Sequence, residues 1–125
     1  MPLTIRTEAD WTAWVIAEAR RSGWIAAHFR PARTASGSWS TPVQGDGKGY
    51  PDITAAHPNR PPLFAELKMP GKKPTREQVR WLDTLAADPR VSVAVWYPTD
   101  IEEIRWWLSW DGVDAAAPLP GRWYP

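Results

Sequence analysis

Two short runs of this sequence hold the side chains best suited to chemistry. Pro51-Asp52 lies at the start of one predicted strand, and Glu66-Leu67-Lys68 lies at the end of the next. Two carboxylates can bind a hard divalent cation, and a neighbouring ammonium group can stabilise developing negative charge. This combination of residues suits the hydrolysis of a phosphodiester.

The alternation of side chains along a strand decides which of these residues share a face. Over residues 63–68 it sends Phe64, Glu66 and Lys68 to one face and the apolar residues between them to the other. Glu66 and Lys68 are then neighbours, roughly 7 Å apart along the strand. The alternative is an exposed pair of charges at a strand edge, which contributes little to stability. The basic loop that follows argues for a functional pair.

The predicted order of elements can position these residues. Apolar residues at helical spacing, each time after a threonine that can act as N-cap, predict helices over residues 7–21, 75–87 and 99–108. Short apolar runs bounded by Gly or Pro predict strands over residues 24–29, 50–56, 63–68 and 91–97. The last of these is rich in valine and should be buried on both faces. The order αβββαβα predicts an α/β fold with a mixed central sheet of about four strands flanked by helices.

Three irregular segments connect or follow these elements. Residues 31–49 are rich in Ser, Thr, Gly and Pro, and a loop of that length is usually functional or mobile. Residues 57–62 are expected to form a tight proline-rich connection, and residues 111–125 a Pro/Gly-punctuated aromatic tail. With a length of 125 residues, the chain is expected to form one domain over residues 1–125.

The composition excludes several classes of protein. A formal net charge of +1 excludes a general polycation, and the absence of cysteine excludes disulfides, thiolate zinc sites and cysteine nucleophiles. No apolar run approaches the length of a membrane span, and an N-terminus that carries Glu8 and Asp10 does not resemble a signal peptide. We therefore expect a cytoplasmic protein with no membrane partner.

Positive charge is nevertheless clustered. Four arginines form one group, and five basic residues broken only by Glu77 form another: Arg20, Arg21, Arg30 and Arg33, then Lys68, Lys72, Lys73, Arg76 and Arg80. Two solvated faces are the alternative interpretation. Seven of the basic residues are candidate contacts for DNA phosphates: Arg30, Arg33, Lys48 in a glycine-rich turn, Lys72, Lys73, Arg76 and Arg80.

The ten tryptophans indicate either an aromatic core or an aromatic contact surface. Five aromatic residues gather near the C-terminus: Trp106, Trp107, Trp110, Trp123 and Tyr124. Core packing is the simplest interpretation of this group. A dimer interface is the second, and stacking on unpaired bases is a third that would require more positive charge than the segment carries.

The motifs together resemble a known family. Gly49-Tyr50-Pro51-Asp52, the run of residues 64–68 and the run of residues 75–82 resemble the PD-(D/E)XK nuclease superfamily, specifically its VRR-NUC branch as found in phage proteins. A glycine before PD, an ExK strand end and a glutamine on the next helix form the shared pattern. The similarity covers most of the chain and implies a restriction-endonuclease-like core.

The resemblance implies a role for each matching residue. Asp52 and Glu66 correspond to the metal-binding carboxylates, and the backbone carbonyl of Leu67 corresponds to a further ligand. Lys68 corresponds to the lysine that positions or activates the attacking water. Gln78 corresponds to a helix glutamine that lies beside the site.

One position of the family's pattern has two candidates in this chain. The first helix of the family also offers a glutamate to the site. Glu8 is the preferred match, where it would assist catalysis and contribute to the metal site, and Glu18 is the competitor.

The resemblance also implies a DNA endonuclease that depends on Mg²⁺ or Mn²⁺ and leaves a 3′-hydroxyl and a 5′-phosphate. Phage members of this kind resemble homodimeric nucleases of branched DNA or Holliday junctions. One alternative is a non-cleaving DNA-binding or assembly module, against which the intact Asp52, Glu66 and Lys68 argue. Another is a nuclease subunit that is active only within a larger phage complex.

Overall fold

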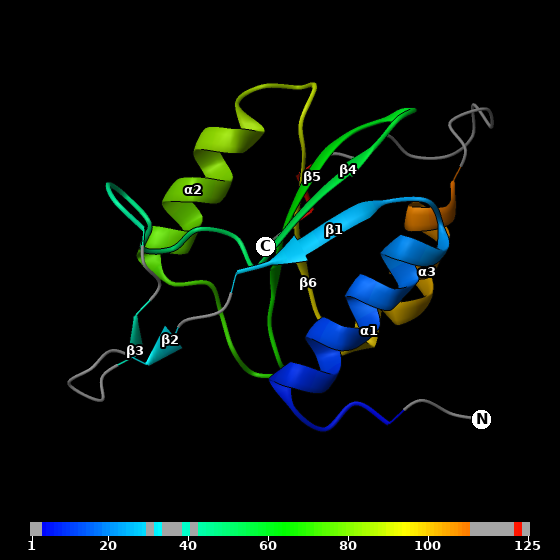
Figure 1. Ribbon diagram of the computed structural model, residues 1–125, viewed down its shortest axis with the longest axis horizontal. Coiled ribbons are helices and arrows are strands. Elements are labelled where there is room, and N and C mark those ends of the chain that lie inside the picture. The colour runs from blue at the N-terminus through cyan, green and yellow to red at the C-terminus, as the bar shows by residue number, and fades with distance from the viewer. Residues whose placement is uncertain (1–3, 30–31, 34–38, 41–42, 111–121, 124–125) are drawn as a thin grey trace.

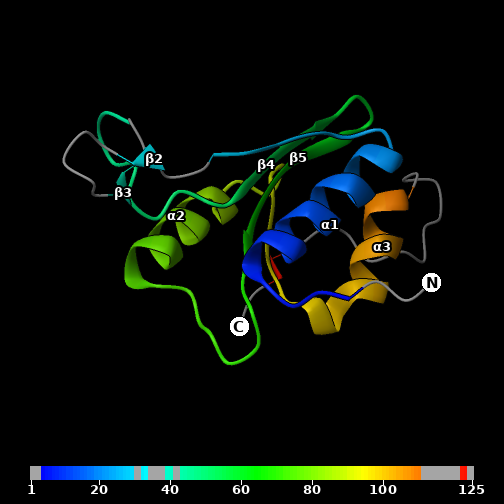
Figure 2. The same ribbon diagram turned by 60° about the horizontal axis from the view of Figure 1, so that its bottom comes forward.

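The structure, a computed structural model, describes residues 4–29, 32–33, 39–40, 43–110 and 122–123. The described elements form three layers (Figure 1). Helix α2 (Arg76–Ala86) covers one face of a central sheet, whereas α1 (Glu8–Arg21) and α3 (Ile101–Ser109) cover the other. Figure 2 shows the same separation of α2 from the other two helices. The predicted α/β architecture is confirmed.

The sheet is mixed. Its strands lie in the order β1 (Ile25–His28), β4 (Ile53–His57), β5 (Arg60–Leu67), β6 (Ser92–Trp96) and β7 (Arg122–Trp123). The first three pair antiparallel, and β5, β6 and β7 pair parallel. The four longer strands and the three helices follow one another in the predicted order. Every residue of β6 is buried, as its run of valines predicts.

Capping explains where the helices begin. The hydroxyl of Thr7 accepts from the N–H of Asp10, whose carboxylate accepts from Thr7, and Thr75 and Gln78 form the same reciprocal pair in α2. The prediction of Thr99 as an N-cap is wrong, because Asp100 is the cap of α3. The preceding residues form a 3₁₀ turn, Pro98–Asp100, in which the carboxylate of Asp100 turns back to accept from the N–H of Tyr97 at 3.1 Å.

Several predicted boundaries need correction. The turn of the β4–β5 hairpin is shorter than the predicted connection, so that Pro61 and Pro62 lie inside β5. The register of the hairpin shifts between Ala55 and His57. This bulge accommodates the two prolines, which have no N–H to donate to the neighbouring strand. The predicted loop of residues 31–49 contains two short paired strands, β2 (Ala32–Arg33) and β3 (Trp39–Ser40), and the predicted tail contributes β7.

Tryptophans dominate the core on the side of α1 and α3. Trp11, Trp14, Trp24, Trp96 and Trp107 are all buried there, packed on the apolar face of β5. That face consists of Leu63, Ala65 and Leu67, as the predicted alternation requires. A smaller cluster of Leu82, Val93 and Val95 lies under α2. Among the described residues no helix is long and apolar enough to cross a membrane.

Candidate functional site

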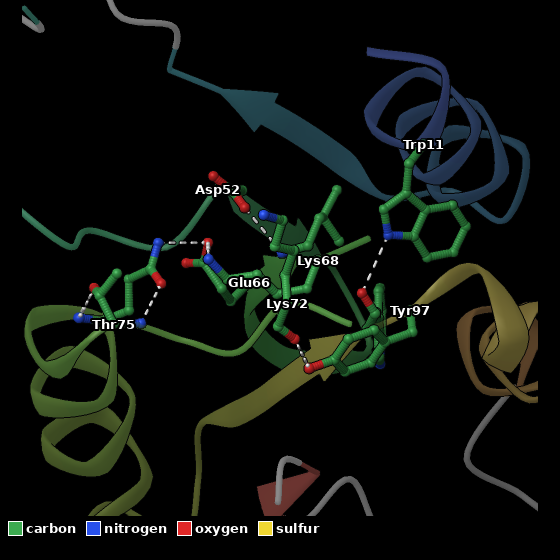
Figure 3. A network of polar contacts seen from close by, with 10 residues as sticks. Trp11, Asp52, Glu66, Lys68, Lys72, Thr75 and Tyr97 are labelled. Atoms are coloured by element: carbon green, nitrogen blue, oxygen red, sulfur yellow. Dashed lines mark hydrogen bonds and ion pairs between the residues drawn. The ribbon is translucent and has the colours of Figure 1, made fainter. Parts of the chain in front are cut away.

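The register of the β4–β5 hairpin brings the two candidate carboxylates together. Ile53 pairs with Ala65, so Asp52, one residue before β4, lies opposite Glu66 and shares its face of the sheet. Asp52 Oδ2 accepts from the N–H of Leu67 at 2.9 Å, which fixes the carboxylate against the end of β5. Figure 3 shows Asp52, Glu66 and Lys68 gathered between the start of α2 and the first turns of α1.

Glu66 is a buried acid with an incomplete set of partners. Its side chain is 1% exposed, and its Oε1 accepts from Gln78 Nε2 at 2.9 Å. Its Oε2 is buried without a hydrogen-bond partner among the described residues. Burial raises the pKa of Glu66 to about 9, and the neighbouring charge of Asp52 adds to this rise, whereas the positive charge of Lys68 offsets only part of it.

Lys68 lies beside Glu66 and is tied to the neighbouring strand. Its Nζ is 4.0 Å from Glu66 Oε1, and its side chain is only 16% exposed. Its backbone N–H donates to the carbonyl of Trp96 at 3.0 Å, and the indole N–H of Trp11 donates to the same carbonyl at 3.1 Å. The carbonyl of Trp96 thus connects the end of β5, β6 and α1 next to the candidate site.

Gln78 connects the start of α2 to the same pair. Its Oε1 accepts from the N–H of Thr75 at 2.7 Å, while its Nε2 donates to Glu66. The capping interaction therefore orients the amide, so that the helix presents a neutral donor to the buried acid. Gln78 lies beside the two carboxylates, where the resemblance placed it.

The two candidate glutamates of α1 lie in different surroundings. Trp11 contacts the backbone next to Lys68, and Glu8 lies one turn before it, at the same end of the sheet. Glu18 lies seven residues after Trp11, about 10 Å farther along the helix. Its carboxylate is bound by Arg21 at 2.6 Å and by Arg105 at 2.9 Å. Glu8 is exposed on the first turn of α1 and has none of these ion pairs.

The donor set can be tested for its fit to a divalent cation. No group of three or more carboxylates and imidazoles is close enough to hold a metal ion within the described ranges, so Glu8 is not gathered with Asp52 and Glu66. Mg²⁺ nevertheless binds commonly through one or two carboxylates, with water and substrate phosphates completing its shell. Oε2 of Glu66, which has no hydrogen-bond partner among the described residues, and the neighbouring carboxylate of Asp52 would be the two carboxylate ligands. These residues fit Mg²⁺ or Mn²⁺.

The carbonyl of Leu67 can contribute to the same donor set. In a strand, the N–H and C=O of one residue point to the same side. Since the N–H of Leu67 donates to Asp52, its carbonyl faces the same edge of β5.

The glycine-rich turn before Asp52 lies against α2. Gly49 has a φ of 85°, and a Cβ at this position would be only 2.5 Å from the carbonyl carbon of Glu77, so the close approach requires glycine. Trp81 Nε1 donates to the carbonyl of Asp46 at 3.0 Å, and Lys48 pairs with Glu77 at 3.3 Å. The turn thus positions the approach to Asp52 and is not followed by the helix that a phosphate-binding loop requires.

A cleft of about 910 Å³ opens beside Asp52 and Gln78. It runs along the glycine-rich turn and is lined by three aromatic side chains, Phe29, Tyr50 and Trp81. Sequence reasoning did not single out these three residues as functional. Tyr50 and Trp81 lie within the family-like runs, but the proximity of their rings depends on the packing of the turn against α2, which no spacing reveals.

The candidate DNA contacts lie mostly on the surface. Lys72, Lys73, Arg76 and Arg80 are exposed on α2 and on the loop before it, and Lys48 is exposed despite its ion pair with Glu77. Arg30 lies outside the described residues, as does the side chain of Arg33. Their predicted contacts remain predictions.

The C-terminal tryptophans divide between core and surface. Trp107 is buried and stacks on Trp24, which fits the core interpretation, whereas Trp106 is exposed. Trp24, Trp107 and Trp110 surround the guanidinium of Arg60 at 4.4 to 5.1 Å. Tyr124 and the side chain of Trp123 lie outside the described residues.

No protein-family model, curated protein or solved structure matches the chain.

Proposed function

We propose that this protein is a DNA nuclease that depends on a divalent cation. The observation that carries the proposal is the pairing of buried Glu66 with half-buried Asp52, in which Oε2 of Glu66 has no hydrogen-bond partner among the described residues and Lys68 lies beside Glu66. A fold that buries two acids side by side loses stability unless a proton or a cation lies between them.

Asp52, Glu66 and the carbonyl of Leu67 would hold Mg²⁺ or Mn²⁺. When bound, the cation would neutralise phosphate charge and lower the pKa of a water molecule. Lys68, at 4.0 Å from Glu66, positions that water and stabilises the charge that develops on the phosphate. Attack of a water on phosphorus would break the bond to the 3′ oxygen, and the proton that the water loses would balance the one that the leaving oxygen gains, so that a 3′-hydroxyl and a 5′-phosphate result.

The distribution of charge supports DNA as the substrate. Exposed basic residues on α2 and on the loop that leads to it flank the side of the sheet on which Glu66 lies: Lys72, Lys73, Arg76 and Arg80. Phosphate contacts of this kind position a duplex without reading its sequence. The finer assignment, a homodimeric phage nuclease of branched DNA or Holliday junctions in the bacterial cytoplasm, rests on the resemblance.

A cleavage assay tests the proposal. Four-way junction, flap, single-stranded and plain duplex DNA are incubated with Mg²⁺, Mn²⁺ or EDTA. We expect metal-dependent cleavage by the wild type and its loss in Asp52→Asn and Lys68→Ala. Glu18→Gln, a matched removal of a buried carboxylate away from the site, should retain activity. Cleavage in EDTA, or equal activity of Asp52→Asn, would contradict the mechanism, and binding without cleavage would favour the non-cleaving module.

A further inference from the structure

We propose that the cleft beside Asp52 and Gln78 binds an unpaired nucleobase of the DNA strand that is cut. The proposal rests on the nuclease function and narrows it to a substrate class, DNA with an unpaired nucleotide next to the scissile phosphate. A preference for unpaired DNA would then come from stacking in the cleft, in addition to phosphate contacts.

The size and position of the cleft fit a nucleotide. Its volume of about 910 Å³ lies within the usual range for small-molecule sites. Asp52 and Gln78 line the cleft, as do Phe29 and Trp81. A nucleotide with its phosphate at the carboxylates would therefore place its base among the aromatic side chains.

The aromatic side chains are held in place before any ligand binds. The rings of Tyr50 and Trp81 meet edge to face at 5.1 Å between centroids, and those of Phe29 and Tyr50 meet similarly at 6.2 Å. The hydroxyl of Tyr50 is hydrogen-bonded to Thr54 at 2.7 Å, and the indole N–H of Trp81 holds the carbonyl of Asp46. A preorganised site loses little entropy on binding.

Exposed apolar surface in the cleft points to a ligand with a flat apolar face. Phe29 is 58% exposed and Val43 is 55% exposed, and both line the cleft. An edge-to-face contact occupies at most one face of the Phe29 ring, so a base can stack on the other. Base stacking on aromatic side chains tolerates any sequence but needs a base that has left the duplex stack.

The polar rim of the cleft suits a nucleotide better than an apolar ligand. Lys48 lines the rim and can approach a phosphate, since its pairing with Glu77 is exposed to solvent. The Nδ1–H of His28 donates to the carbonyl of Asp52 at 2.8 Å, which ties the exposed end of β1 to the residue that begins the site. The lining of the cleft thus joins the aromatic rings to Asp52.

Binding measured in EDTA tests the inference without cleavage. The probe is a duplex with a short flap that carries 2-aminopurine as its first unpaired base, compared with a fully paired duplex and with a flap that is abasic at this position. We expect quenching of 2-aminopurine on binding to the wild type. Phe29→Leu should weaken flap binding about tenfold and leave binding of the paired duplex within about twofold, whereas Phe29→Trp should retain flap binding.

The abasic flap separates stacking from phosphate contacts. If the base enters the cleft, the wild type and Phe29→Leu should bind the abasic flap with equal affinity, since the abasic flap has no base that could stack on Phe29. Equal affinity of the wild type for base-containing and abasic flaps, or equal weakening of flap and paired duplex by Phe29→Leu, would overturn the inference. Metal-dependent cleavage without this base preference would refute the inference alone, whereas base binding without any cleavage would refute the nuclease function alone.

Discussion

Two buried glutamates of this protein have contrasting partners. Glu18 is 7% exposed and meets two guanidinium groups, those of Arg21 and Arg105, at less than 3 Å. Glu66 is 1% exposed and meets a neutral amide and a second carboxylate, with the ammonium of Lys68 no closer than 4.0 Å. Glu18 therefore has two guanidinium groups within hydrogen-bond distance, whereas Glu66 has one ammonium group, that of Lys68, at 4.0 Å.

Under the proposed function, this difference separates a structural acid, Glu18, from a metal-binding one, Glu66. A buried carboxylate with paired arginines stabilises the contact between α1 and α3 and has no free oxygen to offer. A buried carboxylate beside another acid is destabilising in the metal-free protein, and such an arrangement is typical of functional sites.

Cleavage should distinguish the two glutamates most strongly. Glu66→Gln removes a proposed metal ligand, so its rate should fall by at least about 1,000-fold, equivalent to several kcal/mol of transition-state stabilisation. Glu18→Gln should stay within a few-fold of the wild type. The measurement is single-turnover cleavage with saturating Mg²⁺. Similar losses in both variants would mean that the contrast has no bearing on function.

The same two variants should change the free energy of unfolding in opposite directions. In EDTA near pH 8, Glu66→Gln should stabilise the protein by about 1–2 kcal/mol, because a neutral amide can donate to Asp52 without the proton uptake that Glu66 requires on folding. Glu18→Gln should destabilise it by about 1 kcal/mol, a modest loss because Arg21 and Arg105 are partly exposed. Urea unfolding measures both values, and a loss of stability in Glu66→Gln would contradict the account.

The stability of the metal-free protein should depend on pH through Glu66. Its pKa is raised from 4.5 to about 9, so between these values the folded state retains a proton that the unfolded state has lost. The free energy of unfolding should therefore fall as pH rises through this window, by at most about 1.4 kcal/mol per pH unit. Urea unfolding in EDTA across the window should show this slope in the wild type and not in Glu66→Gln. The same slope in both proteins would assign it to other groups.

Much of this arrangement could be predicted from local sequence. Alternation placed Glu66 opposite the apolar face of β5, the threonine caps of α1 and α2 marked their first turns, and the valine run identified β6. These signals are local, so they do not depend on the rest of the fold. The short connection between residues 50–56 and 63–68 predicted a hairpin. The pairing of its two strands places Asp52 beside Glu66.

Features that depend on tertiary packing could not be predicted. Arg21 is a local partner of Glu18, but the second guanidinium, that of Arg105, follows Glu18 by 87 positions, and its contact with Glu18 depends on the packing of α1 against α3. The aromatic cleft depends on the contact of Gly49 with Glu77 of α2. The boundary errors at Pro61 and Asp100 arose because a bulge and a 3₁₀ turn replaced the simplest local geometry.

The thermal shift on adding Mn²⁺ or Mg²⁺ tests the central claim most directly, because it reports cation binding without any substrate. At a metal concentration about tenfold above the dissociation constant, the melting temperatures of the wild type and of Glu18→Gln should rise by about 4 °C relative to EDTA. The melting temperature of Glu66→Gln should not change. Unchanged melting of the wild type, or an equal rise in Glu66→Gln, would contradict a cation site at Asp52 and Glu66.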